Sequence, residues 1–153
     1  MSDECIGCDV IVGRIDPPGG IIYQNSHWVV NHAVANPKPL LKGLLIIQPK
    51  RHVEHIADLS VEEMLSFAPL LRNVCLALRK VLQPAKIYAC SFGDGVKHVH
   101  FIIIPRSSEM PPEGSQVLEE VVHDKLWTCM ENEAAEVVFN VREELHKSFK
   151  QDG

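Results

Sequence analysis

Short runs of strand-forming residues, each bounded by turn-forming residues, recur along the chain. They lie at 21–24 (IIYQ), 27–34 (HWVVNHAV), 44–49 (LLIIQP), 86–92 (KIYACSF) and 98–106 (HVHFIIIPR). Asn25 and Ser26 separate the first two runs as a hairpin turn, and Gly93, Asp94 and Gly95 form a tight turn between the last two. The pattern predicts an antiparallel sheet of about five strands.

One long amphipathic helix is predicted from Ser60 to Leu82. Ser60 can cap its first turn, and Glu63, three residues later, can return the hydrogen bond. Pro69 lies inside the helix, where we expect it to cause a kink and to point away from the core. The apolar stripe that should pack across one face of the sheet consists of Met64, Ala68, Leu71, Cys75, Leu78 and Leu82.

The order of these elements predicts an α+β fold. Two shorter helical patterns follow the strands, at 117–130 and 134–149. Strand runs that flank a long helix, without regular strand-helix alternation, are typical of this class rather than of a doubly wound sheet. With 153 residues, 46% of them hydrophobic, the chain suits one domain with a substantial core. We therefore expect a single domain over residues 1–153.

Charge and composition narrow the classes of partner and location. The net charge is −5, and no run of basic residues is longer than the pair Lys50-Arg51, so polymeric DNA or RNA is not an expected partner. No stretch approaches the ~18 apolar residues of a membrane span, and the first ten residues lack the order of a signal peptide. We expect no membrane contact and a cytoplasmic protein. Five cysteines, with Cys75 and Cys90 inside apolar patterns, do not suit a secreted disulfide framework.

Cys5 and Cys8 form a C-x-x-C pair near the start of the chain. A thioredoxin-like redox pair would be expected between a strand and a helix, and these cysteines lack that context. A zinc site needs two more ligands, which are available from His52, from His55 and from the histidines of the last strand run. By spacing alone, a zinc site and two free thiols fit the pair equally well.

Two histidines lie two residues apart at the start of the last strand run. Because side chains alternate along a strand, His98, His100 and Ile102 should share one face. A single histidine at such a place is more often buried and satisfied by carbonyl groups than functional. Two on one face favour chemistry, because neutral imidazole is a metal ligand, a nucleophile and a general base near neutral pH.

The stretch HVHFIIIPR resembles the signature of the histidine triad (HIT) family, in which three histidines alternate with apolar residues. The segment CIGCDVIVGRI resembles the start of the family branch that carries a C-x-x-C pair, and LLIIQPKRHVEHIADLSVEEM resembles its strand-loop-helix unit. The resemblance implies a compact HIT-like fold, usually a homodimer. It also implies a nucleotide-binding enzyme that cleaves bonds at an α-phosphate through a nucleotidyl-histidine intermediate.

Carried over by position, the resemblance assigns roles to single residues. His100 stands where the family has its nucleophile. A structural zinc would be bound by Cys5, Cys8, His52 and His98. Ser91 and Gly95, together with backbone amides, would hold phosphate oxygens, and Asn36 is the candidate for a substrate contact near the ribose, with Asn31 and His32 as alternatives.

Two positions depart from the family pattern. Ile102 stands where the third histidine is expected, and it can neither donate a proton nor share charge with the nucleophile. Asp94 falls near a position where the family has a glutamine, and a carboxylate there would repel a phosphate. These departures leave a zinc-stabilised nucleotide-binding module with little or no turnover as the alternative to a hydrolase or nucleotidyl transferase. A scaffold that uses only the dimer fold is a third reading.

Overall fold

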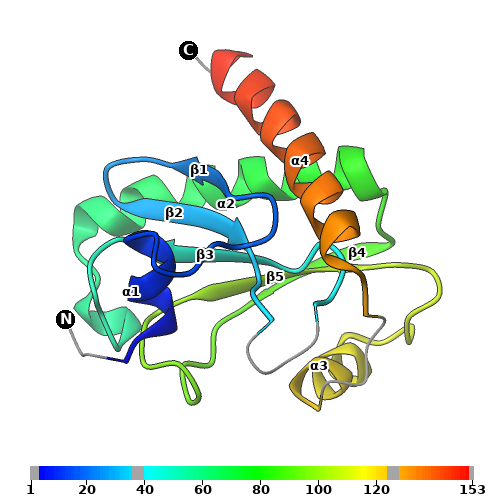
Figure 1. The fold of residues 1–153 in the computed structure, drawn as a ribbon, viewed down its shortest axis with the longest axis horizontal. Coiled ribbons are helices and arrows are strands. Elements are labelled where there is room, and N and C mark those ends of the chain that lie inside the picture. The colour runs from blue at the N-terminus through cyan, green and yellow to red at the C-terminus, as the bar shows by residue number, and fades with distance from the viewer. Residues whose placement is uncertain (1–3, 36–39, 124–127, 152–153) are drawn as a thin grey trace.

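The computed structural model describes residues 4–35, 40–123 and 128–151. Five strands form one sheet in the spatial order β1-β2-β3-β5-β4, and every neighbouring pair is antiparallel (Figure 1). The strands are β1 (Ile21–Gln24), β2 (Trp28–His32), β3 (Leu45–Pro49), β4 (Lys86–Cys90) and β5 (Phe101–Arg106). The predicted α+β fold and five-stranded antiparallel sheet are therefore confirmed.

The connection between β4 and β5 is longer than predicted. The pairing of these strands ends at Cys90, so residues 91–100 join them and the expected tight turn at 93–95 is wrong. The two histidines at positions 98 and 100 consequently precede β5 instead of lying within it. The reason is a different backbone partner, because the Val99 N–H donates to the carbonyl of Val53, 2.7 Å away, in the loop after β3.

Two long helices cover one face of the sheet. Helix α2 (Val61–Leu82) and helix α4 (Glu131–Gln151) contact each other and the strands, and the main core lies between them and the sheet. The residues of this core that are essentially inaccessible to solvent include Trp28, Val30, Leu45, Ile47, Leu70, Val74, Leu78, Ile103, Val138, Val141 and Leu145.

Two short helices lie below the sheet at opposite ends of it (Figure 1). Helix α1 (Ile6–Ile11) was not predicted. Helix α3 (Gly114–Val122) packs on a second, smaller core formed by Leu44, Ile104 and Val117. Of the helix predicted at 117–130, residues 124–127 lie outside the described part. Among the described residues, none of the helices has the length and apolar character needed to cross a membrane.

The start of α2 has the predicted capping box. The Glu63 N–H donates to Ser60 Oγ at 3.1 Å, and the Ser60 N–H donates to the Glu63 carboxylate at 2.7 Å. The same carboxylate receives two hydrogen bonds from Arg51, which also reaches the carbonyl of Asp58. The loop after β3 is thereby fixed to the first turn of α2.

The buried face of α2 differs from the predicted stripe. Of the six predicted residues only Leu78 is buried, while Met64 and Ala68 are exposed and Leu71, Cys75 and Leu82 are half-buried. The buried residues are instead Glu63, Phe67, Leu70, Asn73, Val74, Ala77 and Leu78. Aromatic packing explains the shift, because the ring of Phe67 packs at a tilt against Trp28 and Phe101, with centroid distances of 4.9 and 4.2 Å.

Pro69 lies on the exposed side of α2, as predicted, and the helix continues through it. A proline has no N–H, so the carbonyl of Leu65 loses its partner in the helix. Leu65 is 73% exposed, and water can satisfy that carbonyl. This position explains how a 22-residue helix tolerates an internal proline.

We predict that Leu70→Ala lowers the free energy of unfolding by about 2–5 kcal/mol, because it removes a fully buried leucine from the core. Urea denaturation followed by circular dichroism would measure this change. Leu65→Ala is the matched control on the solvent side of the same helix and should change stability by less than about 0.5 kcal/mol. Equal losses for the two variants would contradict the observed register of α2.

Candidate functional site

Helix α1 positions the two cysteines of the C-x-x-C pair. Cys5 is the N-cap residue of this helix, and the Cys8 N–H donates to Cys5 Sγ at 3.4 Å. Both side chains are buried. This N–H holds the Cys5 sulfur at the start of the helix, close to that of Cys8.

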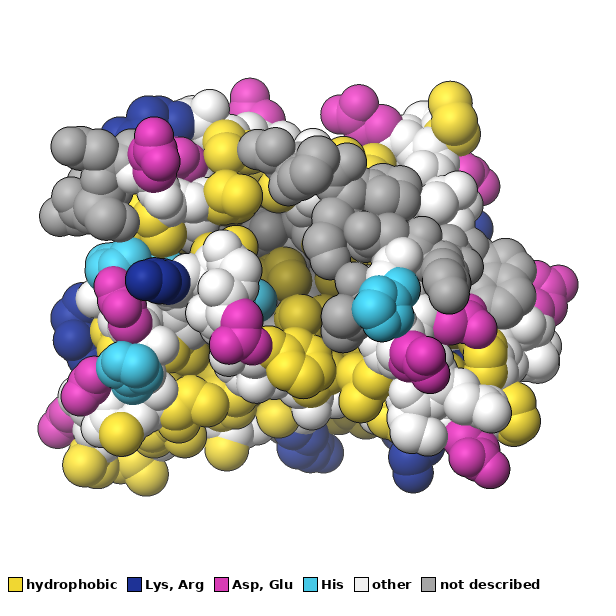
Figure 2. All heavy atoms as spheres, turned by 90° about the horizontal axis from the view of Figure 1, so that it is seen from below, with side chains coloured by type: hydrophobic (Ala, Val, Ile, Leu, Met, Phe, Trp, Pro, Cys, Tyr) yellow, Lys and Arg dark blue, Asp and Glu magenta, His cyan; other side chains and the backbone are white. Residues whose placement is uncertain are grey.

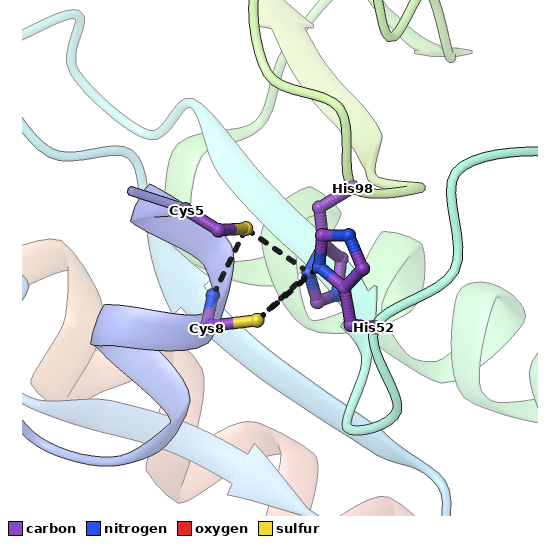
Figure 3. A group of neighbouring side chains, drawn as sticks. All are labelled: Cys5, Cys8, His52 and His98. Atoms are coloured by element: carbon purple, nitrogen blue, oxygen red, sulfur yellow. Dashed lines mark hydrogen bonds between the residues drawn. The ribbon is translucent and has the colours of Figure 1, made fainter. Parts of the chain in front are cut away.

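His98 faces both cysteines from the opposite side. Its Nδ1 lies 3.5 Å from Cys5 Sγ and 3.6 Å from Cys8 Sγ, and its side chain is completely buried (Figure 3). The Nε2–H donates to the carbonyl of Pro49 at 2.9 Å. This bond fixes the tautomer in which Nδ1 carries a free lone pair directed at the two sulfur atoms. Burial lowers the pKa of His98, which also keeps the ring neutral.

His52 completes the group from the loop after β3. Its Nδ1 lies 3.3 Å from Cys8 Sγ, and its ring meets that of His98 edge-on, with centroids 5.2 Å apart (Figure 3). Its Nε2 lies 3.6 Å from a carboxylate oxygen of Glu54. Glu54 therefore attracts the outer nitrogen of the ring and leaves Nδ1 to face the sulfur.

These four side chains form a group that could hold a metal ion. One ligand atom from each of Cys5, Cys8, His52 and His98 lies within 4.8 Å of all the others. With usual zinc bond lengths, a tetrahedral site has an S···N separation of about 3.5 Å, and the observed separations are 3.3–3.6 Å. The donor set and its spacing fit a metal. His55, the alternative ligand, is exposed and does not belong to this group.

Gly7, between the two cysteines, permits the close approach of α1 to the sheet. A Cβ atom at this position would lie 2.8 Å from Gln48 Oε1 and 2.9 Å from His98 Cγ. Any larger residue would therefore push the helix away from His98. Sequence reasoning missed both Gly7 and Glu54, although the glycine inside the C-x-G-C motif was a visible signal.

Burial raises the pKa of the Cys8 thiol to about 11, and its contact with Cys5 adds to this effect. The Cys8 thiol is thus protonated at neutral pH until a cation arrives. Binding of a metal must displace this proton, since only the thiolate is a good ligand.

His100 lies outside the metal-ligand group and is half-buried. Its Nδ1–H donates to the carbonyl of His98 at 2.7 Å. This bond leaves Nε2 with a free lone pair, the state required of a nucleophile or general base. The backbone of one histidine thus orients the ring of the other.

The structure describes two of the three residues that are predicted to contact the substrate. Ser91 and Gly95 lie in the connection before His98, where Ser91 is half-buried and Gly95 is exposed beside an equally exposed Asp94. Asn36 lies outside the described residues. The structure therefore leaves all three contacts as predictions.

Asn31 and His32, the alternatives to Asn36, are internal residues. Asn31 accepts a hydrogen bond from Gln48 at 3.1 Å and donates to the carbonyl of His32 at 2.8 Å. The His32 ring joins the carbonyl of Ala33 to the N–H of Gly43. Both side chains are at most 2% exposed and have polar partners within the protein, so they are poorly placed to contact a ligand.

The lower side of the molecule is hollowed between the ends that carry α1 and α3 (Figure 2). Hydrophobic side chains lie at the bottom of the hollow, and histidine side chains lie on both sides of it (Figure 2). A concave face with an apolar floor and nearby imidazoles is a common setting for ligand binding.

Comparisons with known proteins identify relatives. The HIT domain model matches residues 16–109. An adenosine 5′-monophosphoramidase from Schizosaccharomyces pombe is 30% identical over 110 residues, which are 69% of this chain and 77% of that protein. A bis(5′-adenosyl)-triphosphatase from Dictyostelium discoideum is 26% identical over 132 residues, which are 78% of this chain and 86% of that protein.

Solved structures share the fold. A Zn-bound histidine triad family protein from Mycobacterium smegmatis has a TM-score of 0.71, with 99% of each chain covered. Its sequence identity to this chain is 18%, so the likeness is one of fold alone.

We predict that the purified chain binds one metal ion through this group and that Cys5→Ser removes most of it, because the variant loses a thiolate ligand. Elemental analysis of the purified protein would measure the metal content. Cys75→Ser, at a half-buried thiol on α2, is the matched control and should keep the metal. Unchanged metal content in Cys5→Ser would show that the group is not the binding site.

Proposed function

Because the chain belongs to the HIT domain family, we propose that it is a nucleotide hydrolase or nucleotidyl transferase acting at an α-phosphate. His100 is the proposed nucleophile, and the observation that carries this role is the hydrogen bond from its Nδ1–H to the carbonyl of His98. The names of relatives, a monophosphoramidase and a triphosphatase, support the substrate class.

The proposed reaction has two steps. His100 Nε2 attacks the α-phosphorus, and the other half of the substrate departs with the electrons of the broken bond. Water then attacks the nucleotidyl-histidine and releases the nucleoside monophosphate. Ser91, Gly95 and Asn36 are the proposed contacts to the substrate, and residues 1–153 act as one domain.

We propose zinc as the metal and a structural role for it. Two thiolates and two imidazoles are a preferred ligand set for zinc, and four protein ligands leave no open position for a substrate. The metal would hold α1 against the sheet beside His100. Its bond to His98 would also hold the carbonyl that orients the nucleophile.

A nucleotide-binding module with little turnover is the second candidate function. Ile102 favours it, since an apolar side chain stands where the family pattern has its third histidine. Losing one donor of this kind typically costs about 2.7–4 kcal/mol at the transition state, so slow turnover is expected for any substrate whose leaving group depends on that donor.

We predict that His100→Ala abolishes release of AMP from diadenosine triphosphate and from adenosine 5′-phosphoramidate, because it removes the attacking nitrogen. Nucleotide affinity and thermal stability should change little. Chromatography would measure AMP, and calorimetric titration would measure binding. His55→Ala, at an exposed histidine, is the matched control. If the native chain binds AMP but releases none from either compound, the binding module is favoured instead.

We also predict a homodimer, formed by pairing of strand β4 with its copy. This strand is at the end of the sheet, so one side of its backbone is free of strand partners among the described residues. Beside it lies a groove of about 390 Å³ lined by residues that include Cys75, Leu76 and Ile87. Sedimentation velocity should give twice the mass of the chain, and a monomer at micromolar concentration would contradict the prediction.

A further inference from the structure

A row of three side chains crosses the sheet immediately beyond His100. Ile102 pairs with Ile46 on β3 and with Cys90 on β4. Cross-strand partners have side chains on the same face of a sheet, so these three are direct neighbours. Phe101 packs on the opposite face, toward α2. His100 directly precedes β5, one residue before Phe101 and two residues before Ile102.

This row supplies no ready proton donor. Ile46 and Ile102 are hydrocarbon, and both pack in the second core with Ile104. Cys90 is the one member of the row with a titratable proton, and burial raises the pKa of its thiol. Its Sγ lies 3.8 Å from the carbonyl oxygen of Ile102, so the S–H already points at the backbone.

We propose that Ile102, with Ile46 and Cys90, makes the site selective for nucleotides whose leaving group departs as a stable anion. The substrates would be mixed anhydrides of a nucleoside monophosphate with a carboxylic or phosphoric acid. Phosphoramidates and alkyl esters would be poor substrates. This inference rests on the proposed role of His100 as nucleophile.

The movement of electrons and protons in each step explains this selectivity. When His100 Nε2 bonds to phosphorus, the P–O bond of an anhydride breaks and its electron pair leaves on a carboxylate or phosphate oxygen, which needs no proton. The P–N bond of a phosphoramidate breaks readily only if the nitrogen is protonated, which a positioned acid would normally do. In the second step water bonds to phosphorus, the P–Nε2 bond breaks, and the proton of water passes to solvent.

The test compares kcat/KM for three compounds in the full chain with its metal. Acetyl adenylate and diadenosine triphosphate are anhydrides with a carboxylate and a phosphate leaving group, and adenosine 5′-phosphoramidate needs a proton. Ile102→His should raise kcat/KM for the phosphoramidate by about 10–100-fold, because it adds a positioned acid, while the two anhydrides change by less than about threefold. Ile102→Asn, polar but without a titratable proton, is the matched control and should give no gain.

The native chain also tests the inference without any variant. Across aryl esters of AMP, the rate should fall steeply as the leaving phenol becomes less acidic, and Ile102→His should flatten this dependence. Equal rates for phosphoramidate and anhydrides would overturn the inference while leaving the proposed function intact. So would a selective loss of phosphoramidate cleavage in Cys90→Ala, because the thiol would then be the donor. No AMP from any compound would overturn the proposed function and this inference together.

Discussion

The side chain of His98 is completely buried, and each of its ring nitrogens has a different partner. Nε2 is bonded to the carbonyl of Pro49 at the end of β3, and Nδ1 faces the two cysteines of α1. Its own carbonyl receives the hydrogen bond from His100. One residue thus joins the sheet, the N-terminal helix and the candidate nucleophile, and a shift of its ring would disturb all three.

Local sequence signals predicted the elements whose stability is local. The capping box at Ser60 and Glu63 formed as expected because its hydrogen bonds lie within one turn. The buried face of α2 could not be found in the same way. The choice between Leu70 and Leu71 depends on Phe67, which packs against Trp28 from a distant strand. The helical repeat of apolar residues alone is compatible with burial of either face of α2.

The same distinction between local signals and distant contacts applies to the candidate site. The resemblance assigned the four residues that the structure brings together in the metal-ligand group, whereas spacing alone left His55 as an alternative to His52. The roles of the residues around the metal-ligand group were harder to predict from the sequence. Glu54 and Gly7 act through their distances to other side chains, which no motif specifies, and Asn31 looked available until its partners Gln48 and His32 were known.

The metal-ligand group also has a consequence for the order of folding. Cys5 and His98 are 93 positions apart, and closing a loop of that length costs chain entropy on the order of 4 kcal/mol. A helix of six residues has no independent stability in water with which to offset that cost. Docking of α1 therefore has to follow assembly of β3 and the 98–100 segment, so that α1 is among the last elements to become ordered.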